Sequence, residues 1–204
     1  MQLLSRLLDI VTPNNKWIKQ NNQHNTKTMA CSITIGRKIP CKSAFGGIKK
    51  VYFSDYGGIS SVTVDSITGE ATISTGTPAP VWYEYDVKGN SSLETTVTSS
   101  RENGTTFYTQ TLNLTLTYLD ALTQQELQIL AVGRPYVVVE DYYGNQFLCG
   151  AENGMECTGG TVVSGSAAGD LSGFTMVFEG MEETAPYFLD AAVTPDATQI
   201  DPTA

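Results

Sequence analysis

The segment Thr105–Tyr118, TTFYTQTLNLTLTY, alternates between polar and apolar side chains along most of its length. A period of two places successive side chains on opposite faces of a β-strand, and it predicts one dry and one polar face. The apolar positions are Tyr108, Leu112, Leu114, Leu116 and Tyr118. The polar positions are Thr109, Thr111, Asn113, Thr115 and Thr117. A chain with this segment is expected to contain a β-sheet with one buried face.

This segment is one arm of a predicted long hairpin. Ser92–Ser100 is the other arm, and Glu102-Asn103-Gly104 between them supplies the positive φ angles that a tight turn requires. Both arms exceed the ~5 to 6 residues of a usual strand, and long free edges favour pairing between subunits. The polar face lacks long charged side chains, so it fits an enclosed space or a protein contact; an ordinary solvated face explains it equally well.

Shorter runs rich in β-branched and aromatic residues predict further strands. They are Ser61–Ser74 with a turn at Thr68-Gly69, Val81–Val87, Tyr136–Glu140, Gln146–Cys149, and, as the last strand, Ser172–Glu179 with Phe174, Met176 and Phe178 on one face. Together these patterns predict a mainly β fold. We expect an antiparallel β-barrel or sandwich with one flanking α-helix and a long β-hairpin.

The flanking helix is predicted from a capping box at Thr123–Glu126, with Leu122 before it at the position of a hydrophobic staple. It should extend to about Val132 and end at Gly133. The residues expected to face the core are Leu127, Leu130 and Ala131.

The two ends of the chain lack the β pattern. Residues 1–28 are predicted to form a flexible arm, in which Leu3, Leu4, Leu7 and Leu8 have the spacing of a short amphipathic helix. Two explanations of this arm are equally good. Its helix docks on a partner, or residues 1–28 lie upstream of a natural start at Met29. Residues 29–190 are expected to form a β-rich structural domain, and residues 191–204 a frayed tail. No run reaches the ~20 apolar residues of a membrane helix, so no membrane partner is expected.

Charge is distributed unevenly along the chain. Residues 1–50 contain nine Lys and Arg against the single acid Asp9, whereas residues 51–204 contain three against twenty acids. So acidic a body repels a phosphate backbone, which argues against sequence-specific nucleic-acid binding. Solubility alone is the more common reason for such an excess of charge.

No grouping of residues in the chain predicts a reaction. The one histidine, His24, lies in the predicted arm, so the folded body is expected to lack a Ser-His or Cys-His pair. The cysteines match no common zinc spacing and are expected to be free, partly buried thiols. These cysteines are Cys31, Cys41, Cys149 and Cys157. We therefore expect no enzyme, no metal and no cofactor.

Two segments carry a resemblance to a known family. Met29–Tyr56 contains the elements GR..PCK and GGIK, and Glu152–Pro186 contains ENG, TGG, GDLSGF and G.E...P. With these elements the chain resembles virion structural proteins of short-tailed phages of Bacteroidetes, the crAss-like phages among them. The two segments cover about a third of the chain and include no catalytic residue.

The resemblance implies a tail tube or neck ring subunit, in which a β-barrel or sandwich with a flanking helix repeats as a closed ring around the DNA exit channel. It implies a location in the virion, after assembly in the host cytoplasm. The implied partners are further copies of the chain, neighbouring tail, neck or portal proteins, and passing genomic DNA that is not bound sequence-specifically. The polar residues of Thr109–Thr117 are then the candidate lumen or inter-subunit face.

Two other functions fit the same composition. One is a capsid-surface or receptor-binding module, and the other is a carbohydrate-binding β-sandwich. For the latter, Trp82, Tyr83 and Tyr85 could supply a stacking platform for sugars. Trp82 is out of phase with both tyrosines in a strand, so packing in the core is the expected use of these side chains.

Overall fold

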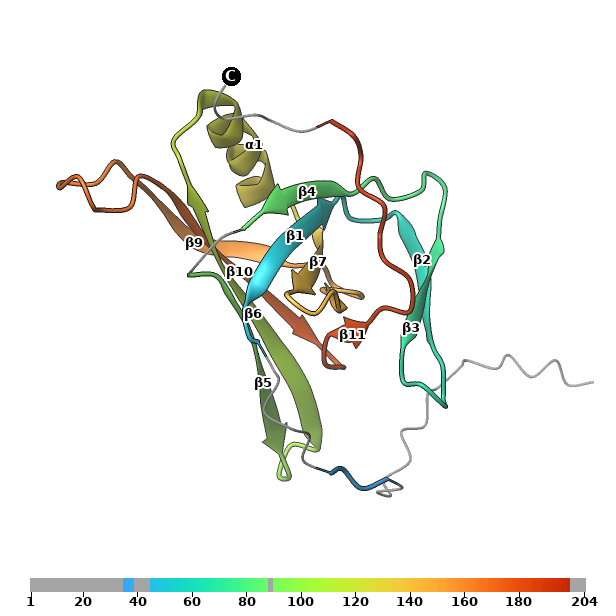
Figure 1. The fold of residues 1–204 in the computed structure, drawn as a ribbon. Coiled ribbons are helices and arrows are strands. Elements are labelled where there is room, and N and C mark those ends of the chain that lie inside the picture. The colour runs from blue at the N-terminus through green and yellow to red at the C-terminus, as the bar shows by residue number, and fades with distance from the viewer. Residues whose placement is uncertain (1–34, 39–44, 88–89, 199–204) are drawn as a thin grey trace, which may run out of the picture. The chain divides into compact units, whose positions relative to one another are not determined.

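Strands dominate residues 45–198, which belong to a compact unit that begins at Ser43 (Figure 1). The structure, a computed structural model, describes residues 35–38, 45–87 and 90–198. The predicted arm, residues 1–28, lies outside the described residues.

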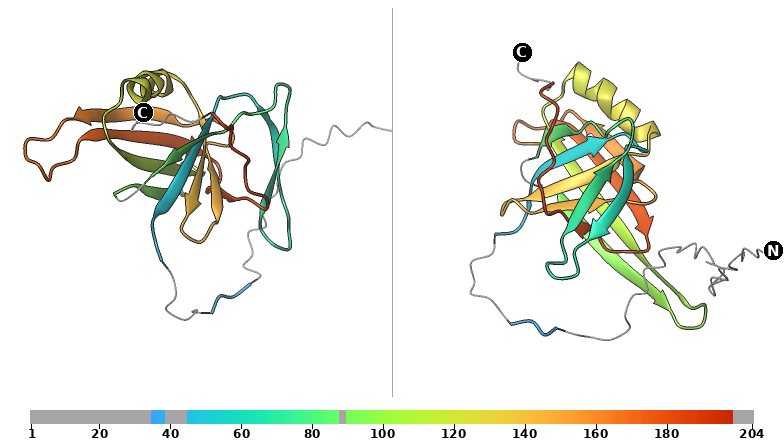
Figure 2. Two further views of the ribbon diagram at one scale, coloured as in Figure 1. Left: turned by 45° about the horizontal axis from the view of Figure 1, so that its top comes forward. Right: turned by 90° about the vertical axis from the view of Figure 1, so that its right-hand side faces the viewer.

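Two antiparallel sheets of this unit pack face to face (Figures 1 and 2). The five-stranded sheet has the order β11-β8-β7-β1-β4, with β1 Ile48–Ser54, β4 Tyr83–Asp86, β7 Tyr136–Asp141, β8 Gln146–Cys149 and β11 Tyr187–Phe188. The four-stranded sheet has the order β5-β6-β10-β9, with β5 Ser92–Ser100, β6 Thr105–Thr117, β9 Glu156–Val163 and β10 Gly173–Glu182. Neither order closes on itself in the described part of the chain, so the predicted mainly β fold is an open sandwich and not a barrel.

The main core lies between these two sheets, and it confirms three of the five predicted residues on the dry face of β6. Tyr108 is only half-buried, and Tyr118 follows the end of the strand and is 55% exposed. Leu112, Leu114 and Leu116 are buried against residues of β1, β7 and β10. Burial of their side chains supplies the hydrophobic free energy that holds the layers together, roughly 1.5 to 3 kcal/mol for each large side chain. The predicted inward residues of β10 are buried as well, namely Phe174, Met176 and Phe178.

A third layer covers the other face of the five-stranded sheet. The hairpin of β2 (Ile59–Val64) and β3 (Ala71–Thr75) contributes Ile59, Val62 and Ile73 to a second core cluster around Trp82. Its turn lies where the sequence predicted it, with φ of +77° at Gly69. The order of layers is therefore hairpin, five-stranded sheet and four-stranded sheet (Figure 2).

The C-terminal segment also belongs to this third layer. The N–H of Asp196 donates to the carbonyl of Trp82 at 2.7 Å, and the N–H of Val193 donates to Oε1 of Gln146 at 2.8 Å. Residues 191–198 thus differ from the predicted frayed tail, because these bonds and the packing of Val193 hold them on the sheet. Residues 199–204 lie outside the described range. Similarly, Ser172–Glu179 was predicted to be the last strand, but β11 follows it.

The one helix in the described part of the chain, α1, spans Ala121–Val132 and ends at Gly133 as predicted. Its N-cap is Asp120, and the predicted cap at Thr123 is wrong. Oδ2 of Asp120 accepts hydrogen bonds from the N–H groups of Leu122 at 2.9 Å and Thr123 at 3.0 Å. A carboxylate with extended backbone satisfies the free donors of the first turn, so the helix begins one turn earlier. Of the predicted inward side chains, Leu127 is buried, Leu130 is half-buried and Ala131 is exposed.

The predicted long hairpin is present as β5 and β6. The two strands pair in unbroken register from Ser92 opposite Asn113 to Ser100 opposite Thr105. Gly104 has φ of +63° in the turn, the left-handed conformation expected from the sequence. In Figure 1 this turn extends at the bottom and the β9–β10 turn extends at the left, since the two turns lie at opposite ends of the four-stranded sheet.

Candidate interaction surface

The five candidate residues of β6 lie together on the face of the four-stranded sheet that points away from the main core. Strand pairing extends this face with residues of β5, β9 and β10 that the sequence alone did not place beside them. Its members are each exposed or half-buried. We call them the Thr-rich face: Ser92, Glu94, Thr96 and Thr98 of β5, Thr109, Thr111, Asn113, Thr115 and Thr117 of β6, Thr175, Val177, Glu179 and Met181 of β10, and Glu156, Gly159 and Thr161 of β9.

Hydroxyl and amide groups of this face bond to one another. Thr161 Oγ1 and Thr175 Oγ1 are 2.6 Å apart across β9 and β10, and Asn113 Nδ2 donates to Ser92 Oγ at 3.3 Å. Thr115 Oγ1 donates to the carbonyl of Asn90 at 3.3 Å. Short side chains that bond to one another make up most of the face, and the longer side chains on it are Glu94, Glu156, Glu179 and Met181, which lies opposite Thr109 and is 61% exposed.

The charge of the Thr-rich face is negative. The strands β5, β6, β9 and β10 contain no Lys or Arg. Glu94 and Glu179 both lie opposite Thr111, and Glu179 also lies opposite Glu156, so three carboxylates form one row across the sheet. Such a surface has no side-chain cation with which to hold a phosphate, and like charges on adjacent strands repel each other.

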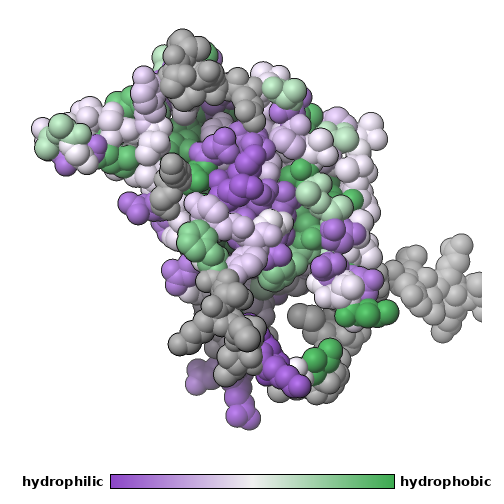
Figure 3. Space-filling view, in the orientation of Figure 1, coloured by the Kyte–Doolittle hydropathy of each residue, from purple (hydrophilic) through white to green (hydrophobic). Residues whose placement is uncertain are grey.

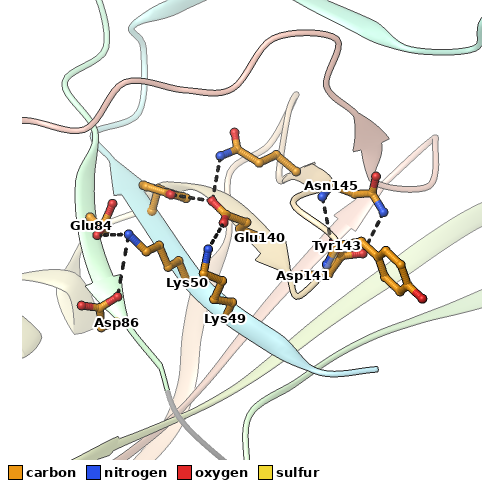
Figure 4. Close-up of polar contacts among 10 residues, drawn as sticks. Lys49, Lys50, Glu84, Asp86, Glu140, Asp141, Tyr143 and Asn145 are labelled. Carbon is orange, nitrogen blue, oxygen red and sulfur yellow. Dashed lines mark hydrogen bonds and ion pairs between the residues drawn. The ribbon is translucent and has the colours of Figure 1, made fainter. Parts of the chain in front are cut away.

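A separate polar cluster lies on the face of the five-stranded sheet that points away from the main core (Figure 4). Glu140 is at its centre, where Oε2 accepts from Tyr52 Oη at 2.7 Å and from Gln146 Nε2 at 3.1 Å, and Oε1 accepts from Lys49 Nζ at 3.1 Å. Beside it, Lys50 Nζ pairs with Glu84 at 2.5 Å. The hydrophilic patch in the middle of Figure 3 lies where β1 and β4 run in Figure 1.

The environment of this cluster stabilises an ionised Glu140. Burial by itself raises the pKa of Glu140, but hydrogen bonds from Tyr52, Lys49 and Gln146 outweigh burial and lower the pKa below its ordinary value. The pKa of Tyr52 is raised, first by burial and then by its hydrogen bond to Glu140, so its hydroxyl remains a donor. Oε1 of the same Gln146 accepts a hydrogen bond from the N–H of Val193. The cluster therefore attaches the C-terminal segment to the sheet, which is a structural role.

Near the end of β10, Glu182 is a buried carboxylate that accepts hydrogen bonds from the backbone N–H groups of Asn153 and Glu152. Burial raises the pKa of Glu182, and these two N–H groups partly counter that effect. Gln110 is also buried, with Oε1 accepting from the N–H of Gly150 at 3.0 Å and Nε2 donating to the carbonyl of Thr184 at 3.2 Å. Both side chains organise the loop between β8 and β9.

The aromatic residues considered as a sugar platform are separated by the fold. Trp82 is buried among the second core cluster, whereas Tyr85 packs edge-on against Phe53 in the main core with ring centroids 5.2 Å apart. Tyr83 is 45% exposed. The expected use in the core is thus found for Trp82 and Tyr85, and the three rings form no common platform.

The remaining residues that the sequence analysis considered are the cysteines and the histidine. Cys149 is a buried free thiol and Cys157 a half-buried one, while Cys31, Cys41 and His24 lie outside the described residues. Within the described ranges, no group of three or more metal-ligating side chains converges. The helix in that same part of the chain is too short and too polar to span a membrane.

Comparisons of the chain with protein-family models, with curated proteins and with solved structures found no match. The class that fold and surface define is an open antiparallel β-sandwich with one flanking helix and a polar, cation-free sheet face.

Sequence patterns missed the buried polar residues Gln110, Glu140 and Glu182. Gln110 had a visible indication, because it occupies an apolar position in the alternation of β6. Glu182 had a similar one, because it continues the inward alternation of Phe174, Met176 and Phe178 in β10. Glu140 had none, since its burial depends on the C-terminal segment that tertiary packing brings to it.

Proposed function

We propose that this protein is a phage virion structural protein, a tail tube or neck ring subunit that forms a closed ring around the DNA exit channel. The observation that carries the proposal is the Thr-rich face, whose strands contain no cation. A wall past which DNA must slide requires the absence of Lys and Arg contacts that would hold its phosphates. The resemblance of Met29–Tyr56 and Glu152–Pro186 to virion proteins supports the same function.

Two further features of the body agree with a structural role. The buried carboxylates Glu140 and Glu182 accept hydrogen bonds from the protein itself, as groups that stabilise the fold do. Among the described residues, the outer strands of the sandwich also leave sheet edges unpaired, which allows subunits to associate. A capsid-surface or receptor-binding module remains the second candidate on this ground, because a free sheet edge serves either assembly.

The proposal is tested with purified full-length protein. Negative-stain electron microscopy should show rings whose opening admits duplex DNA, and the wild-type rings should not retain duplex DNA in a filter or anisotropy assay. Thr111→Lys with Thr115→Lys adds two cations to the Thr-rich face and should make the rings retain DNA, with an affinity that falls as salt rises.

The matched control is Thr63→Lys with Thr75→Lys, which adds the same charge at exposed positions of β2 and β3. This control should leave DNA retention unchanged. Equal retention by both double variants would place the DNA outside the ring and contradict the assignment of the Thr-rich face. Monomers or open fibres in the micrographs would contradict a ring subunit.

A further inference from the structure

The four-stranded sheet ends on both sides in a strand with a free edge. In the described part of the chain, β5 pairs only with β6, and β9 pairs only with β10. β5 contains no Lys and no Pro, and its register with β6 has no bulge. A Lys, a Pro or a bulge usually keeps an edge strand from pairing with another chain. β5 has none of the three, so its edge is open to pairing.

An apolar groove of about 370 Å³ lies between β9 and α1. Phe174 and Met176 of β10 and Leu127 of α1 line it together with Gly160 of β9. A Cβ at Gly160 would come within 2.7 Å of the carbonyl oxygen of Thr175, so this position has to remain without a side chain. The row of β9 side chains on the α1 side is therefore interrupted where the groove lies.

The chain itself contains a side chain that suits this groove. Val97 of β5 is 58% exposed and lies opposite Tyr108, on the side of the sheet away from the Thr-rich face. An exposed valine in the middle of a free edge strand is unfavourable in water and is stabilised when another surface covers it.

We propose that β5 of one copy pairs with β9 of the next copy and that Val97 enters the groove beside Gly160. This inference rests on the proposed ring, and it identifies the two surfaces through which neighbouring copies in the ring would associate. β5 and β10 run in one direction and β6 and β9 in the other, because each neighbouring pair is antiparallel. Copies related by a rotation around the ring axis therefore bring β9 antiparallel to the next β5, and the hydrogen-bond ladder continues between them.

The register supports this pairing through charge. With Val97 opposite Gly160, Thr96 lies opposite Thr161, so the Thr-rich faces of two copies join. Arg101 then comes within about one residue of Glu156. Arg101 is the only Lys or Arg between Ser92 and Thr117, and Glu156 is exposed. The single cation of the hairpin thus meets a carboxylate of the acidic row.

Disulfide cross-linking of the full-length protein tests the register. Thr96→Cys with Thr161→Cys, oxidised with copper-phenanthroline, should give a ladder of covalent oligomers on a non-reducing gel. Wild type and each single variant measure the background from the native thiols and should give no ladder. A dimer from Thr96→Cys that persists when the native Cys157 of β9 is replaced by Ser would show β5 pairing with β5 and would overturn the proposal, as would absence of any ladder.

Charge exchange tests the same contact without new thiols. Arg101→Glu and Glu156→Arg should each weaken self-association in sedimentation, and the double exchange should restore it. Val97→Lys should weaken association by about tenfold or more, since an ammonium group is unfavourable in an apolar groove. Thr63→Lys is the matched control and should associate as wild type does. Failure of the double exchange to restore association would overturn the register.

The outcomes separate this contact from the ring itself. Rings without cross-links in the Thr96→Cys, Thr161→Cys variant would overturn the β5–β9 contact and leave the proposed function standing. A cross-linked ladder of open filaments without rings would support the contact and contradict the ring.

Discussion

Glu182 and Asn153 are joined by a hydrogen bond of 2.8 Å, in which the backbone N–H of Asn153 donates to Oε1 of the Glu182 carboxylate. Oε2 of the same carboxylate accepts from the N–H of Glu152 at 3.2 Å. A buried carboxylate therefore holds the loop between β8 and β9, and its protonation is coupled to the stability of that loop.

Glu182 should make stability depend on pH in a defined direction. Because burial raises its pKa in the folded state, the folded protein binds this proton more tightly than the unfolded chain does. The stability contributed by Glu182 is present below its unfolded pKa of about 4.3 and is lost as pH rises through the raised pKa. The thermal midpoint of Glu182→Gln, relative to that of wild type, should therefore rise as the pH is raised from 4 to 8. The exposed neighbour variant Glu183→Gln should show no such trend, and an opposite trend for Glu182→Gln would refute this account.

Truncation of the same side chain should act differently. Glu182→Ala leaves the N–H groups of Asn153 and Glu152 without their acceptor, at a cost of about 1 to 3 kcal/mol. Urea denaturation at pH 7 measures this loss. Loss below a few tenths of a kcal/mol would mean that the loop finds other partners.

Glu140 should give the opposite pH dependence to Glu182. Its folded pKa is lowered, so its contribution is present above the unfolded pKa of about 4.3 and is lost as pH falls through the lowered pKa. Glu140→Gln should destabilise the protein at pH 7 by about 1 to 3 kcal/mol, because the charged acceptor for Tyr52 and Lys49 is removed. The difference from wild type, measured by urea midpoints from pH 3 to 7, should shrink below about pH 4. Exposed Glu70→Gln serves as the control, and a difference independent of pH would contradict the ionised state of Glu140.

The helix cap can be distinguished by two alanine variants. Asp120→Ala removes the acceptor for two N–H groups of the first turn and should cost about 0.5 to 2 kcal/mol. Thr123→Ala should cost much less, since its hydroxyl caps nothing in the structure. Equal losses in chemical denaturation would restore Thr123 as the cap.

Two glycines of the four-stranded sheet, Gly173 of β10 and Gly159 of β9, test how closely the strands approach. A Cβ at Gly173 would collide with the carbonyl oxygen of Leu116 on β6, whereas a Cβ at Gly159 would meet nothing within 4 Å. Gly173→Ala should therefore destabilise the sheet by about 1 to 3 kcal/mol. Gly159→Ala should lie within about 0.5 kcal/mol of wild type. A tolerated Gly173→Ala would show that β6 and β10 can move apart.

Local pattern was sufficient where one physical preference dominated. The alternation in Thr105–Tyr118 and the turn at Asn103-Gly104 predicted β5 and β6, because burial of one face and positive φ both act between near neighbours. The helix end at Gly133 was equally local. The helix start was not, since Thr123–Glu126 fitted a capping box while Asp120 offered a stronger acceptor nearby.

By itself the sequence determined the mainly β class, the long hairpin with the polar residues of Thr109–Thr117 on one face, the helix that ends at Gly133 and the acidic character of residues 51–204. Tertiary structure alone decided which strands are neighbours, that the sandwich stays open, that 191–198 packs on the sheet, and that Glu140 and Glu182 are buried. The reason is physical: periodicity and turn chemistry depend on residues a few positions apart, whereas strand order, burial of charge and the groove beside Gly160 depend on contacts between distant segments.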